Sequence, residues 1–369
     1  MSTASPITHA LLALVRSALG LAGTPAGGSA DVKENPAVDW NALSEADWQE
    51  ILQMARKQTV TGLLFRGVAN LPAEVQVPDS LLFPLMEETD RIRRQSRLVE
   101  RTAKEITEFF EGRILHPVIL KGPSVACFYP EPDLRESGDI DLYFNEKEFG
   151  KAVHAIRERL QKDGQSESLT TLPDGSLHYK WNGIDIDQHA QYFDLSSSEG
   201  LPPVPSPEAT LLMLSAHILK HSMGTGIGLR QLCDMAMAYE RIRYDQARLL
   251  ACYEATGTAD WNRMLASFLI RYLGATRTPY TSAVEGQTAG TVSPELPGPA
   301  PLLDIVLGGG NFGHHEASRE KVLQAGPLQR KLDTARRFLG RLPFSIRYGP
   351  RQLAHYLKEL IKGNLSQKM

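Results

Sequence analysis

Acidic and aliphatic residues alternate in the stretch Gly138-Asp139-Ile140-Asp141-Leu142. In a β-strand every second side chain lies on the same face, so Asp139 and Asp141 would lie about 7 Å apart on one face. Ile140 and Leu142 would then point into a core. Two like charges at that spacing repel each other unless a cation lies between them. The stretch therefore indicates a cation-binding site at the start of a strand.

A third carboxylate follows in the stretch LHYKWNGIDIDQHAQY, residues 177–192. Asn182-Gly183 between two alternating runs is typical of a β-hairpin. On the second strand of that hairpin, Asp185, Asp187 and His189 would share one face. Mg²⁺ takes carboxylate and phosphate oxygens, and two such ions can clamp the attacking and leaving oxygens of a phosphoryl displacement. Three acids converging on one sheet face predict a metal-dependent site for phosphoryl transfer.

The segments around these acids predict a small α+β unit. Residues 117–120 form a short buried strand that ends at Lys121-Gly122, and a helix begins directly after it. Another helix begins at Asn145, which can act as the N-cap, and Glu148 can complete a capping box. The predicted order is strand, helix, strand, helix and a final hairpin.

Both flanks of this unit are predicted to be helical. The chain divides into an N-terminal helical region at 1–112, the α/β core at 113–200 and a C-terminal helical region at 201–369. Ser206-Pro207 starts the C-terminal helices, because serine caps helices and proline favours their first position. The turn-rich segment 276–301 predicts a mobile loop. The fold class is therefore α+β, with a small mixed β-sheet core flanked by N- and C-terminal helical regions.

The composition excludes several classes of protein. Hydrophobic residues make up 42% of the 369 residues and charged residues 22%, which is typical of a globular protein with a sizeable core. The net charge of −3 gives no general attraction to nucleic acid, and the arginine row at 91–101 is interpreted as a solvated helix face. Cys127, Cys233 and Cys252 are widely spaced, which argues against disulfides and predicts a cytoplasmic location. Arg16 interrupts the apolar N-terminal stretch, so neither a signal peptide nor a transmembrane helix is expected.

Several stretches together resemble one family of proteins. Residues 120–144, LKGPSVACFYPEPDLRESGDIDLYF, resemble the LKG…R…DIDL signature of an uncharacterised bacterial nucleotidyltransferase family in the DNA polymerase β-like superfamily. IDQHAQY at 186–192 is similar to its later DxH strand. The stretch 209–236 is similar to its helix with the pattern H…KH…R…D, and GGGNFGHH at 308–315 is similar to a string found in some members.

The resemblance implies catalytic roles for the acids. Asp139 and Asp141 would hold the metals, which are two Mg²⁺ ions with Mn²⁺ as an alternative. Asp187 would be the third carboxylate, joining one metal and helping to deprotonate the acceptor hydroxyl. Asp185 competes with Asp187 for that role by parity, and the DxH pairing with His189 favours Asp187.

The resemblance also implies residues that bind the nucleotide. Lys121-Gly122 lie in the turn where superfamily members usually have Gly-Ser, and that turn opens a helix whose amides can hold phosphate oxygens. Arg135 could neutralise phosphate charge. His189 would contact the nucleotide, and His217 and His221, with Lys220, Arg230 and Asp234, would line the nucleotide or acceptor cleft. The HILKH spacing of His217 and His221 is also compatible with zinc, but no third ligand is evident.

The predicted activity is transfer of a nucleoside monophosphate from an NTP to an acceptor hydroxyl with release of pyrophosphate. A small molecule or sugar is the favoured acceptor. A protein side chain or an RNA end is the alternative acceptor, although nucleic acid is not favoured. A nucleotide-binding or interaction protein that has lost turnover is the alternative from another class. The sequence leaves open the base of the NTP and the oligomeric state.

Overall fold

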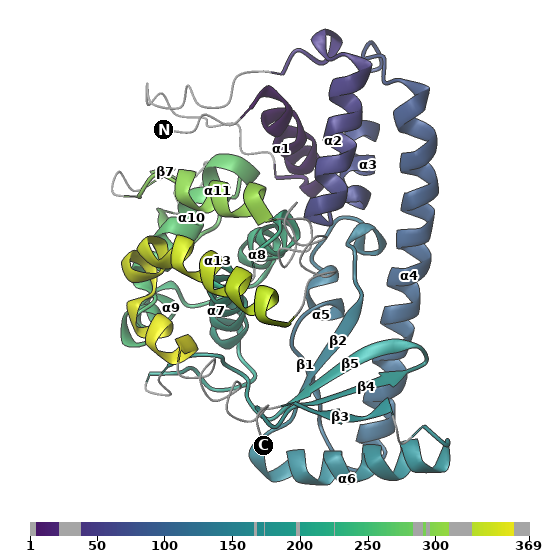
Figure 1. Cartoon of the computed structure of the whole chain (residues 1–369), viewed down its shortest axis with the longest axis vertical. Helices are drawn as coiled ribbons and strands as arrows, with labels where there is room; N and C mark the ends of the chain where they lie inside the picture. Colours follow the sequence, from purple (N-terminus) through teal and green to yellow (C-terminus); the bar gives the residue numbers. More distant parts are fainter. Residues whose placement is uncertain are drawn as a thin grey trace.

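The computed structural model describes residues 5–21, 38–165, 168–172, 174–196, 200–224, 226–282, 291–292, 296–309 and 327–357. Most of these residues are helical, and they surround one five-stranded sheet (Figure 1). The longer helices are α1 (Pro6–Leu19), α2 (Glu45–Gln58), α3 (Thr61–Ala69), α4 (Asp79–Glu111), α6 (Glu146–Lys162), α7 (Pro207–Met223), α8 (Leu229–Arg241), α9 (Gln246–Ala255), α10 (Ala259–Leu273), α11 (Ala300–Gly309) and α13 (Pro327–Tyr348). Shorter ones are α5 (Pro123–Ala126) and two 3-10 turns, Trp40–Ala42 and Pro132–Leu134.

The sheet is mixed, and this confirms the predicted α+β class. Its strands are β1 (Val118–Ile119), β2 (Asp139–Tyr143), β3 (Thr170–Thr171), β4 (Leu177–Trp181) and β5 (Ile184–His189), in the order β1-β2-β5-β4-β3. β2 and β5 are parallel neighbours, and the other pairs are antiparallel. A separate small pair, β6 (Thr281–Ser282) and β7 (Thr291–Val292), lies in the C-terminal part. The predicted hairpin is present, whereas β3 was not predicted.

One face of the sheet is apolar because the alternation in β2 and β5 continues into β4. Ile140, Leu142, Tyr179 and Ile186 are all buried there. They share a hydrophobic cluster with side chains of α4 and α6. Figure 1 shows α6 below the sheet and the long α4 beside it. Since two helices cover the apolar face, the opposite face is left for the charged side chains.

The N-terminal helices begin and end where local signals place them. Ser44 and Asp47 form a capping box at the start of α2. α2 ends before Thr59, which adopts a left-handed backbone with φ +52°. α3 follows after Val60 and packs against α1. α4 then extends from α2 and α3 to the sheet, and so connects the helical region to the core.

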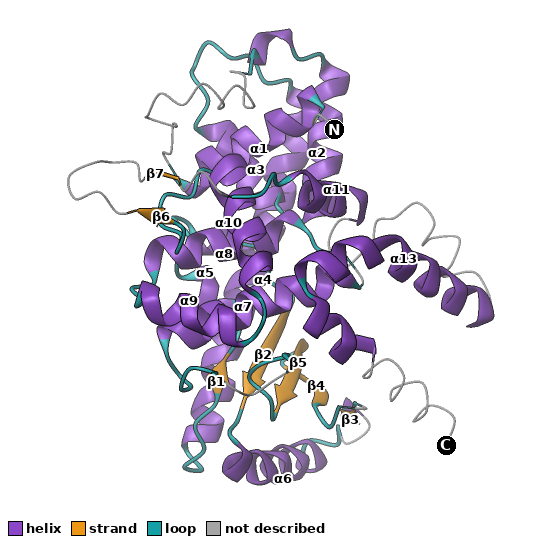
Figure 2. Ribbon diagram, turned by 90° about the vertical axis from the view of Figure 1, so that its left-hand side faces the viewer, coloured by secondary structure: helices purple, strands orange, loops and turns teal. Residues whose placement is uncertain are grey.

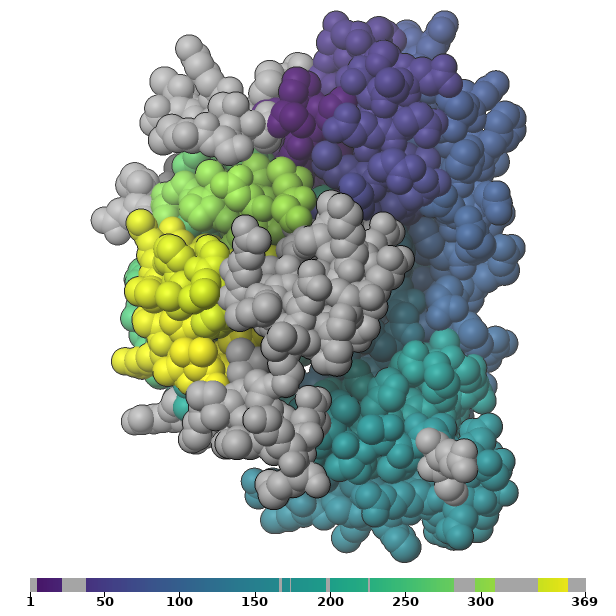
Figure 3. All heavy atoms as spheres, viewed as in Figure 1, coloured from purple at the N-terminus to yellow at the C-terminus, as the bar shows by residue number. Residues whose placement is uncertain are grey.

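The C-terminal helices start as predicted, with Ser206 capping α7 and Pro207 in the first turn. Their buried side chains belong to the same hydrophobic cluster as those of α1–α3. Arg16 in α1 donates to the carbonyl of Arg271 in α10 at 3.0 Å. Figure 3 shows α11 directly beside the N-terminal helices on this face, and Gln58 in α2 donates to the carbonyl of Val306 in α11 at 2.8 Å. The two helical regions therefore pack against each other.

Some predictions concern residues outside the described ranges. Those are residues 310–315 of GGGNFGHH and residues 283–290 and 293–295 of the turn-rich segment. Among the described helices, none combines the length and the apolar character required to cross a membrane.

Candidate active site

The polar face of the sheet gathers the acids that the sequence singled out. β2 and β5 run parallel with Asp139 opposite Asp185 and Asp141 opposite Asp187. Residues opposite each other in a sheet point to the same face, so all four carboxylates lie together. This face is turned toward the C-terminal helices, since Lys121 beside β2 reaches His217 of α7. In Figure 2 the strands lie between α6 and the C-terminal helices.

Asp141 is the most enclosed of the acids, with 6% of its surface exposed. Lys121 Nζ lies 3.0 Å from its Oδ1, and His189 Nε2 lies 3.2 Å from the same oxygen. Burial alone would raise the pKa of Asp141, but the charges and hydrogen bonds of Lys121 and His189 lower it to about 2. The cation that the paired acids demand is therefore present within the chain as the ammonium of Lys121.

Backbone pairing puts Lys121 in that position. β1 pairs with β2, and the amide of Leu120 continues the ladder by donating to the carbonyl of Asp141 at 3.0 Å. The chain then turns at Gly122, whose φ of +66° favours glycine. A Cβ there would lie 3.2 Å from the carbonyl oxygen of Asp139, so the turn passes close to the start of β2. The predicted phosphate-binding turn and the acids are thus neighbours.

Asp139 has a different environment from Asp141. Its side chain is exposed at the start of β2, but nearby protein atoms remove part of its water shell. This partial desolvation, together with repulsion from Asp141 and Asp187, raises the pKa of Asp139, and Lys121 and Arg230 oppose the rise. Asp139 is therefore protonated more readily than a carboxyl group in water.

The two candidate third carboxylates each have a basic partner on β4. His178 Nδ1 lies 2.8 Å from Asp187 Oδ1, and His178 Nε2 lies 3.4 Å from Asp185 Oδ1. Lys180 Nζ lies 2.9 Å from Asp185 Oδ1. Asp187 is the one that lies opposite the enclosed Asp141. Sequence reasoning missed His178, although counting outward from the Asn-Gly turn pairs it with Asp187.

The histidines of α7 reach the site through Lys121. Lys121 Nζ lies 3.5 Å from His217 Nδ1, and an ammonium can only donate, so this nitrogen accepts in a neutral imidazole. The rings of His217 and His221 are 4.4 Å apart. Burial, followed by the charge of Lys121, lowers the pKa of His217 well below its usual value and that of His221 to about 3. Both histidines are therefore neutral at pH 7.

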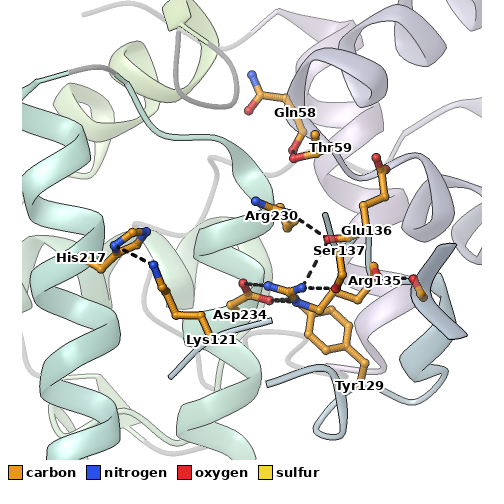
Figure 4. Close-up of polar contacts among 11 residues, drawn as sticks. Gln58, Thr59, Lys121, Tyr129, Arg135, Glu136, Ser137, His217, Arg230 and Asp234 are labelled. Carbon is orange, nitrogen blue, oxygen red and sulfur yellow. Dashed lines mark hydrogen bonds and ion pairs between the residues drawn. The ribbon is translucent and has the colours of Figure 1, made fainter. Parts of the chain in front are cut away.

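Arg135 lies four residues before Asp139 and is committed to a buried ion pair (Figure 4). Its Nε and Nη2 each donate to a carboxylate oxygen of Asp234 in α8 at 2.7 Å. Tyr129 donates to the same carboxylate at 2.7 Å, and Arg135 Nη1 donates to Ser137 Oγ at 2.6 Å. Sequence reasoning missed Tyr129, for which no local pattern gave a signal. This network fixes the loop that leads into β2.

The donor set on the polar face fits a hard cation, because it consists of carboxylates whose repulsion is only partly relieved. The Lys121 ammonium already occupies such a position beside Asp141. Within the described part of the chain, however, no three His, Cys, Asp or Glu side chains lie close enough together to hold a metal ion. Binding Mg²⁺ here would require the carboxylates to move closer together, and Lys121 and His178 to release the oxygens that they contact. The zinc alternative at His217 and His221 gains no third ligand within the same residues.

The core of the protein is thus a mixed sheet with acids on its open face and helices on its apolar face. A family model described as an uncharacterised nucleotidyltransferase matches residues 44–203, from the cap of α2 to the linker before α7. The matched segment contains β2, β5 and the turn at Lys121. No curated protein and no solved structure matched the chain. α7 and α8, which supply His217, Arg230 and Asp234, lie outside the matched segment.

Proposed function

We propose that this protein transfers a nucleoside monophosphate from an NTP to an acceptor hydroxyl in a Mg²⁺-dependent reaction. The observation that carries the proposal is the convergence of Asp139, Asp141 and Asp187 on one sheet face within the nucleotidyltransferase segment. Two of these acids are on β2 and the third is on its parallel neighbour. A rigid sheet supports such a constellation better than a loop does.

Asp139, Asp141 and Asp187 would hold Mg²⁺, which supplies charge stabilisation to the attacking and leaving oxygens. Asp187 accepts the proton of the acceptor hydroxyl as its oxygen forms a bond to the α-phosphorus. The bond from the α-phosphorus to the oxygen that bridges to the β-phosphorus breaks, and the electron pair leaves with pyrophosphate. Asp187 suits this role because it lies opposite the enclosed Asp141, whereas Asp185 lies opposite the exposed Asp139 at the start of β2.

Lys121 would move its ammonium from Asp141 to a phosphate oxygen when the nucleotide binds. Its side chain is 24% exposed and lies beside the glycine turn, so a phosphate can approach it. His217 is neutral and accepts a hydrogen bond from the same ammonium, so it can orient Lys121 without repelling it. Arg135 has Asp234 and Ser137 as partners, so it would hold the loop before β2 in place instead of contacting a phosphate.

The test follows the label from each phosphate. The protein is incubated with Mg²⁺ and an NTP labelled at the α- or the γ-phosphate, together with a pooled extract of cellular hydroxyl compounds. We expect the α-label on an acceptor and the γ-label in pyrophosphate. Asp141→Asn should lower transfer roughly a thousandfold, because several kcal/mol of charge stabilisation is lost. Asp163→Asn, at the end of α6, is the matched control. Transfer of the γ-label, or equal transfer by Asp141→Asn, contradicts the proposal.

A further inference from the structure

Arg230 is a second arginine beside the candidate active site, and it lacks the partner that Arg135 has. It lies in the first turn of α8, outside the segment that matches the family. Its Nη1 donates to the carbonyl oxygen of Glu136 at 2.8 Å (Figure 4). Its Nε is buried without a hydrogen-bond acceptor. Among the described residues, no carboxylate forms an ion pair with it.

This arrangement is costly for a charged group. Burying a cation without a paired anion is unfavourable, and arginine remains protonated in proteins. Arg135 donates to the same carbonyl of Glu136, but its charge is paired, because Asp234 accepts hydrogen bonds from two of its nitrogens. Burial, and next the charge of Arg135, lower the pKa of Arg230. The guanidinium of Arg230 therefore lies in a place that favours an additional anion.

Three acids lie near Arg230 without forming an ion pair with it. Asp234 already accepts two hydrogen bonds from Arg135 at 2.7 Å. The carboxylate of Glu136 accepts a hydrogen bond from the amide of Thr61 at 2.7 Å, and burial raises its pKa, which weakens its charge as a partner. Asp139 lies three residues after Glu136, whose carbonyl oxygen accepts from Arg230. Arg230 is thus oriented at the loop that carries the predicted metal-holding acids.

We propose that Arg230 binds the triphosphate of the nucleotide. This inference rests on the proposed function, and it adds a residue from α8 to a site formed by residues 121–189 and His217 of α7. A guanidinium presents a planar fork that matches two phosphate oxygens, and its free Nε provides a donor with no present acceptor. Arg230 donates to the carbonyl oxygen of Glu136 in the loop before β2, and Lys121 contacts Asp141 in β2, so both cations lie beside the acids of that strand.

The experiment compares wild type with Arg230→Gln by calorimetric titration in Mg²⁺. The probes are ATP, GTP, CTP and UTP, inorganic tripolyphosphate, and the nucleoside of whichever NTP binds. The glutamine should weaken NTP and tripolyphosphate binding by the same factor of about ten or more, and leave nucleoside binding unchanged. Arg97→Gln is the matched control, because that arginine is 67% exposed on α4 and pairs with Asp133.

Each outcome has a distinct meaning. If wild type binds the NTP and Arg230→Gln binds it equally well, the inference about Arg230 fails and the proposed function stands. If wild type binds neither NTP nor tripolyphosphate, the proposed function fails as well. Thermal unfolding without ligand shows whether Arg230→Gln folds. Should it not fold, Arg230→Lys keeps the charge but loses the fork, and undiminished tripolyphosphate binding by that variant overturns the inference.

Discussion

The ion pair between Arg135 and Asp234 joins the loop before β2 to α8, so breaking it should destabilise the whole protein. The side chains are 4% and 7% exposed. Two hydrogen bonds of 2.7 Å connect them. Burial would lower the pKa of Arg135 and raise that of Asp234, but each partner more than reverses the shift of the other. Both groups are therefore ionised.

The magnitude follows from what each single change leaves behind. Asp234→Ala leaves the guanidinium of Arg135 buried without its anion and removes the acceptor of Tyr129, which should cost about 3–5 kcal/mol. Arg135→Met leaves the carboxylate of Asp234 without its bidentate partner at a similar cost. The double variant Arg135→Met/Asp234→Leu removes both charges and keeps the volume, so it should be far less destabilised than the sum.

Urea unfolding of the four proteins gives the double-mutant cycle. We expect an interaction energy of roughly 3 kcal/mol or more between the two residues. Lys180→Met/Asp185→Leu provides a control cycle, because that pair lies on the open face and its side chains are 56% and 41% exposed. A coupling energy below about 1 kcal/mol between Arg135 and Asp234, as expected of surface pairs, would show that this ion pair is not a major source of stability.

Three further predictions follow from individual residues. Gly122→Ala should cost more stability than Gly164→Ala, because both have positive φ but only the first Cβ meets a neighbouring carbonyl, at 3.2 Å; equal losses in urea unfolding would contradict this. Burial lowers the pKa of His221 from 6.5 to about 3, so between these values the unfolded chain binds a proton that the folded one does not. Stability should fall on acidification across that window by about 1.4 kcal/mol per pH unit, and His221→Gln should flatten this slope in urea unfolding at pH 5 and pH 7. Asp187→Asn should abolish nucleotidyl transfer while Asp185→Asn retains most of it, and the reverse order would assign the third carboxylate to Asp185.

Short-range features of the fold could be predicted because adjacent residues encode them. The alternation around Ile140 assigned one face of β2 to the core and the other to the acids. The caps Asn145 and Ser206 marked the starts of α6 and α7, and both accept the expected backbone hydrogen bonds. Asn182 has a positive φ, as the turn of the predicted hairpin requires.

The arrangement of the site depends on contacts that local patterns do not encode. Nothing in the sequence of β2 shows that β5, which follows α6, β3 and β4 in the chain, is its parallel neighbour. The sequence around a lone arginine such as Arg135 does not show whether it binds a phosphate or a carboxylate. Only the packing of α8 places Asp234 beside it. The same holds for Lys121, whose contacts with Asp141 and His217 join three separate segments.

Calorimetric titration tests whether the acids of β2 and β5 bind an NTP together with Mg²⁺. The four NTPs are titrated into wild type and Asp139→Asn, each with and without Mg²⁺. Asp139 is exposed at the start of β2, and partial desolvation and repulsion from Asp141 raise its pKa. Because the charge of Asp139 is unfavourable there, a neutral asparagine should leave the fold intact. We expect Mg²⁺-dependent binding of at least one NTP to wild type and loss of that binding in Asp139→Asn. Absence of binding by every NTP, or equal binding by the variant, would contradict it.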